Sequence, residues 1–140
     1  MTAEIENKIR QSFAAQALMA TLGARLERVD TGRIEISAPI LPAATQQHGY
    51  AHAGLTFAIG DSAAGYAALS MMPDEAEVLT AEMKINLLSP GRGERLIARG
   101  RVIRPGRRLV VVQAEVIALD QGAERLIALM TGTMIPLLPG

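Results

Sequence analysis

The sequence predicts an α+β fold in which an antiparallel β-sheet packs against one long apolar helix. Residues 51–72 contain a single acid, Asp61, and are otherwise uncharged and mostly apolar or small, which favours a buried helix. Beyond Pro73 the apolar residues recur with a period of two, and turn-forming sequences separate the runs. The expected order of elements is therefore helix, hairpin, long helix and then a meander of strands.

Residues 4–22 are predicted to form an amphipathic helix on the surface. Ile5, Ile9 and Phe13 recur at a spacing of four, which places them on one helical face. Gly23 follows the last apolar residue of this segment, and glycine at such a position commonly ends a helix in the left-handed conformation.

Two short strands are expected next, at residues 24–29 and 33–39. The residues between them, Asp30-Thr31-Gly32, suit a tight hairpin turn. Residues 41–50 include a proline and a glycine, so we expect them to form a loop that leads into the long helix.

Four further strands are expected in the second half of the chain. In residues 79–88, apolar side chains at the odd positions alternate with mostly polar ones, and the run ends at Ser89-Pro90-Gly91. The other strands span residues 95–104, 108–119 and 124–136, joined as successive antiparallel hairpins would be. One face of this sheet should cover the long helix, and the other should be covered by the N-terminal helix or by another subunit.

Composition limits the classes of function. The 140 residues, 49% of them hydrophobic, suit one domain spanning residues 1–140. Basic and acidic residues number 14 each, so no overall field attracts nucleic acid or an anionic membrane. Cysteine is absent, which excludes disulfides and thiolate chemistry. We expect a cytoplasmic protein, since the N-terminus alternates acids and bases where an export signal is apolar, and Asp61 disfavours a membrane span.

Asp61 is the leading candidate for a functional side chain. An ionised carboxylate among apolar residues costs free energy unless it is paired, capped or used in catalysis, and no Lys or Arg lies between Arg33 and Lys84. Mostly small residues lie within about 60° of Asp61 on a helix, namely Gly54, Phe57, Ala58, Ala64, Gly65, Ala68 and Met72. Such a stripe admits a thin ligand or tight packing against a sheet or subunit, and the sequence leaves both open.

The start of the long helix is a second candidate. Unpaired N–H groups at a helix N-terminus can polarise a carbonyl oxygen, and Ala53 and Gly54 would supply them. Gly54 lies seven residues before Asp61, about 10 Å along the helix. A thioester or ester carbonyl could therefore bind at the tip, with Asp61 further along the same face.

Other motifs have ordinary explanations. His48 and His52 lack the glutamate of a zinc-protease helix and no third histidine completes a site, so no metal is expected. Both histidines are expected to bond the loop backbone. Ser62 lies in no complete nucleophile elbow, which disfavours a serine hydrolase. Arg107 and Arg108 fit either a hairpin turn with solvated cations or a contact with substrate phosphate.

Three segments together resemble the PaaI-like family of hotdog-fold acyl-CoA thioesterases. They are Gln46-Gln-His-Gly-Tyr-Ala-His52-Ala-Gly54, the acid Asp61, and Thr80-Ala-Glu-Met-Lys-Ile-Asn-Leu-Leu-Ser-Pro90-Gly. The resemblance covers the chain from residue 10 onward. It implies a hotdog fold, in which an antiparallel sheet wraps around a long central helix. It also implies sites at the interface of a homodimer, assembled as a dimer of dimers, which is a homotetramer.

The resemblance assigns roles to individual residues. Asp61 matches the catalytic acid, as nucleophile or general base, and Gln46 matches the side chain that orients the water or thioester. The amide of Ala53, followed by Gly54, matches the donor that polarises the carbonyl, and Thr80 matches a hydroxyl that acts from the partner subunit. Two positions depart from the family, because Ala53 replaces a glycine and Gln46 replaces the usual asparagine. No cofactor is implied, and substrate contacts are expected from His52, Gly49, Gly65, Arg107 and Arg108.

We therefore expect a hydrolase that converts an acyl-CoA, of aryl or phenylacetyl type or with a short to medium chain, to CoA and a free acid. Two alternatives come from other classes. The first is a non-catalytic acyl-CoA-binding module, which the alanine at position 53 motivates. The second is an acyl-thioester hydratase or dehydratase that pairs His48 or His52 with an acid.

Overall fold

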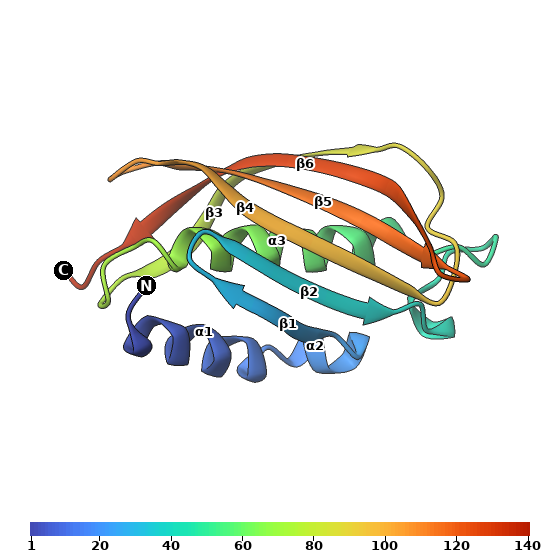
Figure 1. Ribbon diagram of the computed structural model, residues 1–140, viewed down its shortest axis with the longest axis horizontal. Helices are drawn as coiled ribbons and strands as arrows, with labels where there is room; N and C mark the ends of the chain where they lie inside the picture. The colour runs from blue at the N-terminus through green and yellow to red at the C-terminus, as the bar shows by residue number, and fades with distance from the viewer.

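A six-stranded antiparallel sheet, in the order β1-β2-β4-β5-β6-β3, curves around helix α3 (Ala53–Leu69), as Figure 1 shows. The computed structural model describes residues 1–140. This arrangement confirms the predicted α+β class and the packing of the long helix in the sheet. The remaining elements are α1 (Ala3–Ala15), α2 (Ala17–Leu22), β1 (Arg25–Asp30), β2 (Arg33–Pro39), the 3-10 turn η1 (Pro42–Ala44), β3 (Glu77–Leu87), β4 (Arg95–Pro105), β5 (Val110–Asp120) and β6 (Ala123–Leu137).

The N-terminal helix is interrupted at Gln16, where the sequence predicts one continuous segment. Gln16 has an extended backbone and separates α1 from α2. Its side chain donates a hydrogen bond to the Tyr66 hydroxyl in α3 at 2.7 Å, so a tertiary contact accompanies the break. Helical periodicity is similar on both sides of a single extended residue, and the apolar pattern alone could not reveal it. Gly23 ends α2 with φ of 68°, as predicted.

Strand β3 lies at the edge of the sheet, and this corrects the predicted meander. The sequence suggested that β3 would be followed in space by β4. Instead β3 pairs with β6, while β4 lies between β2 and β5. Only β4, β5 and β6 form a meander, joined by the predicted turns. The turn sequence after β3 marks the end of the strand but does not identify its neighbour.

A bulge at Ala81 changes which side chains of β3 face the helix. Residues 80 and 82 pair with consecutive residues of β6, so Ala81 is an extra residue in the strand. Val78 and Met83 both pack against the core, whereas Leu79 is 47% exposed. The predicted apolar face at odd positions is therefore wrong before the bulge and correct after it. The same phase change turns Thr80 toward α3.

Small residues allow α3 to lie close to the sheet. A β-carbon on Gly100 of β4 would overlap the backbone of α3 and lie 2.6 Å from the Ala64 nitrogen. Ala64 and Ala68 are buried, so part of the predicted small-residue stripe serves helix–sheet packing. Gly54 and Phe57, nearer the start of the helix, stay exposed. None of the helices combines the length and apolar character that crossing a bilayer requires.

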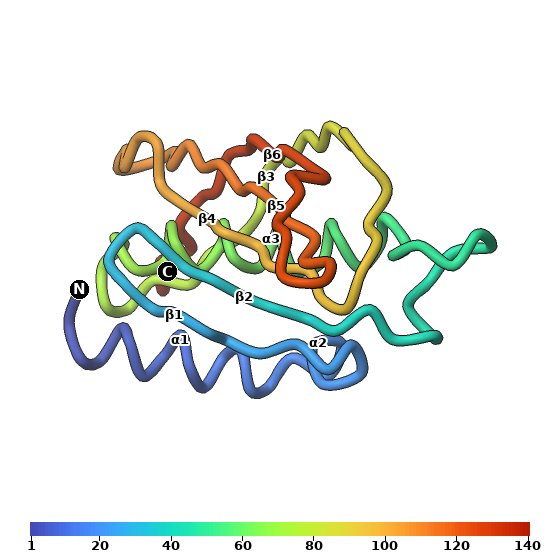
Figure 2. Tube along the Cα trace, turned by 45° about the vertical axis from the view of Figure 1, so that its right-hand side comes forward, coloured from blue at the N-terminus to red at the C-terminus, as the bar shows by residue number.

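The outer face of the sheet is charged, which explains why α1 does not cover it. Arg99 of β4 bonds Glu124 at 3.0 Å and lies 3.9 Å from Glu35 on the other side. Such cross-strand ion pairs suit a solvated sheet face. Helix α1 instead packs beside α3 and β1, where it buries Ile5 and Ile9 (Figure 2). Of the two expected covers, the N-terminal helix is therefore wrong, and cover by another subunit stays a prediction.

Candidate active site

The N-terminus of α3 presents one free amide. His52 caps the helix, because its Nδ1 atom accepts a hydrogen bond from the Gly54 N–H at 2.8 Å. The N–H of Leu55 donates to the His52 carbonyl at 2.9 Å, while the N–H of Ala53 has no acceptor within the chain. Of the two predicted amide donors, Ala53 is thus available and Gly54 is engaged in the cap. A β-carbon at position 54 would lie 2.9 Å from His52 Nδ1, so a larger residue there would displace the capping ring.

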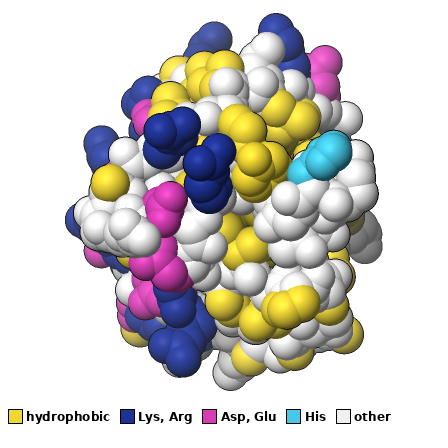
Figure 3. Space-filling model, turned by 90° about the vertical axis from the view of Figure 1, so that its right-hand side faces the viewer, with side chains coloured by type: hydrophobic (Ala, Val, Ile, Leu, Met, Phe, Trp, Pro, Cys, Tyr) yellow, Lys and Arg dark blue, Asp and Glu magenta, His cyan; other side chains and the backbone are white.

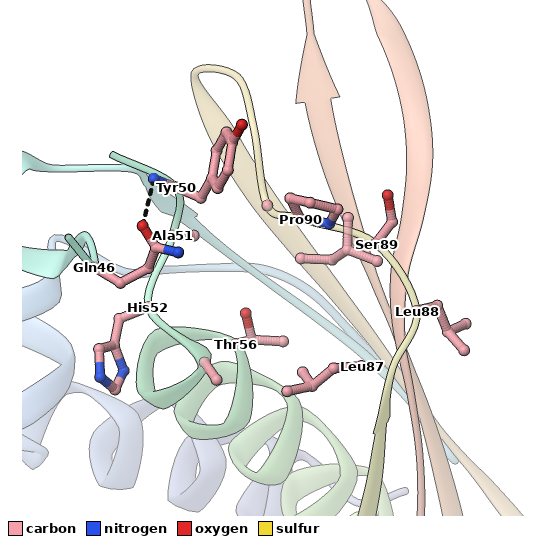
Figure 4. A pocket seen from close by; sticks show the side chains of 12 residues that line it. Gln46, Tyr50, Ala51, His52, Thr56, Leu87, Leu88, Ser89 and Pro90 are labelled. Carbon is pink, nitrogen blue, oxygen red and sulfur yellow. Dashed lines mark hydrogen bonds between the residues drawn. The ribbon is translucent and has the colours of Figure 1, made fainter. Parts of the chain in front are cut away.

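Gln46 is held by the backbone of its own loop. Its Oε1 atom accepts hydrogen bonds from the N–H of His48 at 2.6 Å and of Tyr50 at 3.2 Å. Gly49 completes this turn with φ of 83°, a conformation that favours glycine. Figure 4 shows the bond to Tyr50 and the opposite orientation of the amide nitrogen. That nitrogen has no acceptor in the chain and can donate to a ligand.

Gln46, His52 and Ala53 line a pocket of about 570 Å³ (Figure 4). It lies between the start of α3, the loop before it and the segment that follows β3. Its apolar wall includes Leu87, Leu88, Pro90 and Ile127. At one side the Arg92 guanidinium lies 5.4 Å from the centre of the Tyr50 ring. Figure 3 views the molecule from this end and shows basic and hydrophobic side chains next to each other.

Asp61 lies in a second pocket, of about 250 Å³, which α3, β3 and the N-terminal segment enclose. Thr80 Oγ1 donates a hydrogen bond to Asp61 Oδ1 at 2.8 Å. The two residues belong to the same chain, whereas the family resemblance implied that the Thr80 hydroxyl acts from the partner subunit. Burial raises the pKa of the Asp61 carboxyl above its ordinary value, and the weaker effect of the Thr80 bond lowers that pKa. The raised pKa makes this carboxylate a stronger base than an exposed aspartate.

The helix tip and the acid lie in separate pockets of one chain. The two pockets share no lining residue. Ala53 and Asp61 are eight residues apart on α3, which corresponds to about 12 Å along the axis. A carbonyl that accepts an amide hydrogen bond while a carboxylate, or its water, attacks needs these groups within about 6–9 Å. This spacing argues against one helix presenting both groups to the same carbonyl.

The other predicted substrate-binding residues divide between these two regions. Gly65 lines the Asp61 pocket, and His52 and Gly49 belong to the loop and cap at the helix tip. Arg107 and Arg108 are exposed in the β4–β5 turn. The first residue of β5 pairs with Met134, which in turn pairs with Thr80, so this turn is at the Asp61 end of the sheet.

Sequence reasoning missed part of the Asp61 pocket. Ser12 and Gln16 reach it from the N-terminal segment, and Tyr66 reaches it from α3. In the continuous helix predicted over residues 4–22, a spacing of four would place Ser12 and Gln16 on one face, but nothing in the sequence indicates that this face meets Tyr66. Arg92, beside Tyr50, was missed as well, because the stacking joins two loops.

Comparison with known proteins identifies the family. Residues 48–124 match the model of the thioesterase superfamily. The crystal structure of a thioesterase family protein from Silicibacter pomeroyi is 49% identical, with a TM-score of 0.94, and the match covers 96% of this chain and 99% of that one. A Saccharolobus solfataricus protein that is provisionally named an esterase is 28% identical over 129 residues, which are 92% of this chain and 83% of the relative.

A further solved structure confirms the fold. The PaaI protein from the phenylacetic acid degradation operon of Escherichia coli superposes with a TM-score of 0.84 at 21% identity, over 96% of this chain and 94% of that one. The sheet that curves around α3 is thus the hotdog fold expected from the resemblance. With the family match over more than half of its length, the chain belongs to the thioesterase superfamily and is a thioester hydrolase.

Proposed function

We propose that the chain hydrolyses acyl-CoA thioesters, with Asp61 as the essential carboxylate. The observation that carries this proposal is the environment of Asp61, a partly buried acid with a raised pKa that bonds Thr80 and faces a pocket. Thioester hydrolysis needs a base or nucleophile and a polarised carbonyl, and the thiolate leaves without strong acid assistance. The groups at the two pockets match these needs.

In the proposed reaction, the Thr80 hydroxyl holds one oxygen of Asp61 and the other oxygen acts on the substrate. Asp61 either removes a proton from an attacking water or attacks the carbonyl carbon itself. The oxyanion that forms accepts hydrogen bonds from the Ala53 N–H and from Gln46 Nε2. Collapse of this intermediate breaks the carbon–sulfur bond and expels the CoA thiolate, which solvent protonates. Direct attack would leave a mixed anhydride that water then hydrolyses.

We further propose that two copies of the chain complete each site as a homodimer. Position 57 lies midway between Ala53 and Asp61, so a two-fold axis near Phe57 would set the α3 helices antiparallel. Ala53 of each chain would then face Asp61 of the partner subunit. Phe57 is 38% exposed and Leu87, on the unpaired outer edge of β3, is 59% exposed. An isologous interface would cover both this apolar surface and the open strand edge.

The sizes of the pockets suggest where the substrate lies. The larger pocket, beside Ala53, suits the pantetheine arm of CoA, and the smaller one, beside Asp61, suits the acyl group. Arg92 lies next to the larger pocket and is available for a CoA phosphate. In the proposed dimer the tip of one α3 lies beside Asp61 of the other, so Arg107 and Arg108 of the partner subunit stay candidates for the same role.

The test is thiol release from a panel of short, medium and aryl acyl-CoA substrates by the wild type and by Asp61→Asn. We expect Asp61→Asn to lower kcat/KM by about 10²–10⁴-fold, the usual contribution of a catalytic base. Asp30→Asn is the matched control, because Asp30 is exposed at the end of β1, pairs with Arg28 and lines neither of the two pockets. Equal turnover by wild type and Asp61→Asn would contradict the assigned role. Binding without turnover by the wild type would favour the non-catalytic module.

A further inference from the structure

Three polar side chains form a cluster at the Asp61 pocket that the proposed reaction does not use. The Tyr66 hydroxyl accepts a hydrogen bond from Gln16 Nε2 at 2.7 Å and shares a second hydrogen bond with Ser12 Oγ at 2.9 Å. Tyr66 is 5% exposed, and its ring packs edge-on against Phe13 at 6.5 Å between centroids. The cluster is therefore fixed in place before any ligand binds.

The cluster retains hydrogen-bonding capacity. The Ser12–Tyr66 bond uses one hydroxyl hydrogen, whichever residue donates it, and Gln16 supplies the hydrogen of the other bond. One of the two hydroxyl hydrogens therefore has no acceptor within the chain. Gln16 Oε1 likewise has no donor within the chain and is not fully buried. Since all three residues line the pocket, the cluster can offer a ligand one donor and one acceptor.

The rest of the pocket limits what can occupy it. Its volume of about 250 Å³ admits a short chain or a single ring, since an apolar cavity of about 150 Å³ already holds benzene. Leu69 and Val78 supply apolar wall, while the carboxylates of Asp61 and Glu77 disfavour an anionic group. A neutral acyl chain with a polar end satisfies all of these conditions.

We propose that Ser12, Gln16 and Tyr66 are specificity-determining residues that recognise a neutral hydrogen-bonding group, such as a hydroxyl, near the end of a short acyl chain. The inference rests on the proposed function, because it assumes that the thioester carbonyl lies beside Asp61. Tyr66 follows Asp61 by five residues, about 7.5 Å along α3, so the recognised group is about four to six carbons from the carbonyl. Recognition by a hydroxyl and an amide discriminates against a chain that ends in a methyl group.

The experiment compares 6-hydroxyhexanoyl-CoA with heptanoyl-CoA, which has a methyl group in place of the hydroxyl. We expect wild type to prefer the hydroxyacyl substrate by about tenfold or more in kcat/KM, as one or two well-placed hydrogen bonds would give. Tyr66→Phe and Gln16→Met keep the shape of each side chain and should reduce this ratio to about one, chiefly by lowering kcat/KM for the hydroxyacyl substrate. Gln11→Met, on the exposed face of α1, is the control and should retain the preference.

Binding of the thioether analogues S-(6-hydroxyhexyl)-CoA and S-heptyl-CoA, measured by calorimetry, tests the same preference without turnover. Equal affinities for the two, or equal kcat/KM values for the two substrates, would overturn the inference while leaving the thioesterase proposal intact. Equal losses on both substrates in Tyr66→Phe would show a structural role only. Preferential binding of the hydroxyl analogue with no turnover of either substrate would support the cluster and contradict the proposed function instead.

Discussion

Substitutions at position 53 can test the role of a backbone amide separately from that of a side chain. Ala53 is the first residue of α3, and its free N–H is the proposed donor to the thioester carbonyl. Proline fits the first turn of a helix and removes this N–H. His52 already has φ of −63° and ψ of 140°, which a following proline tolerates.

We therefore expect Ala53→Pro to keep the fold and to lower kcat/KM by about 10²–10³-fold, the usual cost of losing one oxyanion donor. Circular dichroism checks that the fold is kept, and thiol release measures the loss of kcat/KM. Ala53→Gly keeps the N–H and should remain active, with the residue that the PaaI-like motif carries. Full activity in Ala53→Pro would exclude this amide as the donor.

Thr80 should set the pH at which Asp61 becomes active. The reaction needs the ionised carboxylate, and burial raises its pKa, so kcat/KM should rise with pH as Asp61 loses its proton. The Thr80 hydrogen bond favours the ionised form and lowers the pKa. Thr80→Val should therefore move the acid limb of the pH profile to higher pH, and Thr80→Ser should leave it in place. A Thr80→Val limb that stays or moves to lower pH would contradict this effect.

At the residue scale, the sequence identified the residues that carry functional groups, but it could not show which of those groups are already hydrogen-bonded within the chain. The motif around Gln46, Ala53 and Asp61 identified the groups that the structure places at pockets. The sequence could not show that the Gly54 amide is engaged by His52, since that depends on the rotamer of the capping side chain. It also could not join Ser12 to Tyr66, because that contact depends on how α1 docks.

At the scale of elements, the contact of α3 with β4 depends on the absence of a side chain at Gly100. A β-carbon there would overlap the α3 backbone around Ala63 and Ala64, which cannot move without displacing the helix. We expect Gly100→Ala to lower the free energy of unfolding by about 1–3 kcal/mol, the usual cost of overpacking. Denaturant unfolding at fixed protein concentration measures this.

Gly65→Ala is the matched control for that substitution. Its β-carbon would meet only Met134, at 3.8 Å, which is ordinary contact. Alanine also has the higher helix propensity, so Gly65→Ala should be neutral or stabilising by up to about 1 kcal/mol. If Gly100→Ala proved as stable as Gly65→Ala, close helix–sheet contact at this position would be refuted.

Periodicity predicted which helices and strands exist better than it predicted which face of a strand is buried and which strands pair. The sequence predicts that the odd-numbered side chains of β3 face the helix along the whole strand. Because of the bulge at Ala81, the even-numbered side chains face the helix before it. The sequence composition does not reveal an extra residue in a strand, yet this residue turns Thr80 toward Asp61, to which it donates a hydrogen bond. The edge position of β3 was likewise hidden, because the choice between β4 and β6 as neighbour is a matter of long-range pairing.

At the scale of the whole molecule, the proposed function divides each active site between two chains. The tip of α3 offers the free Ala53 amide without a carboxylate, and the middle of α3 offers the carboxylate of Asp61 in a separate pocket. The sequence resemblance implied a dimer, and the separation along α3 gives a physical reason for one. The oligomer is then part of the catalytic machinery, and dissociation should abolish turnover even where each chain stays folded.

Complementation between two inactive variants tests this arrangement directly. In a mixed dimer of Asp61→Asn and Ala53→Pro chains, one site combines the intact Asp61 of one chain with the intact Ala53 amide of the other, and the second site lacks both. After the two variants are unfolded and refolded together at equal concentrations, half of the dimers are mixed and half of their sites are intact. We therefore expect about a quarter of wild-type thiol release. A mixture of Asp61→Asn with Asp61→Ala, two defects in the same half-site, should gain nothing. If the first mixture were no more active than its parents, each chain would have to carry a complete site, and the 12 Å separation along α3 would have to be closed within one subunit by a movement of about 3–6 Å.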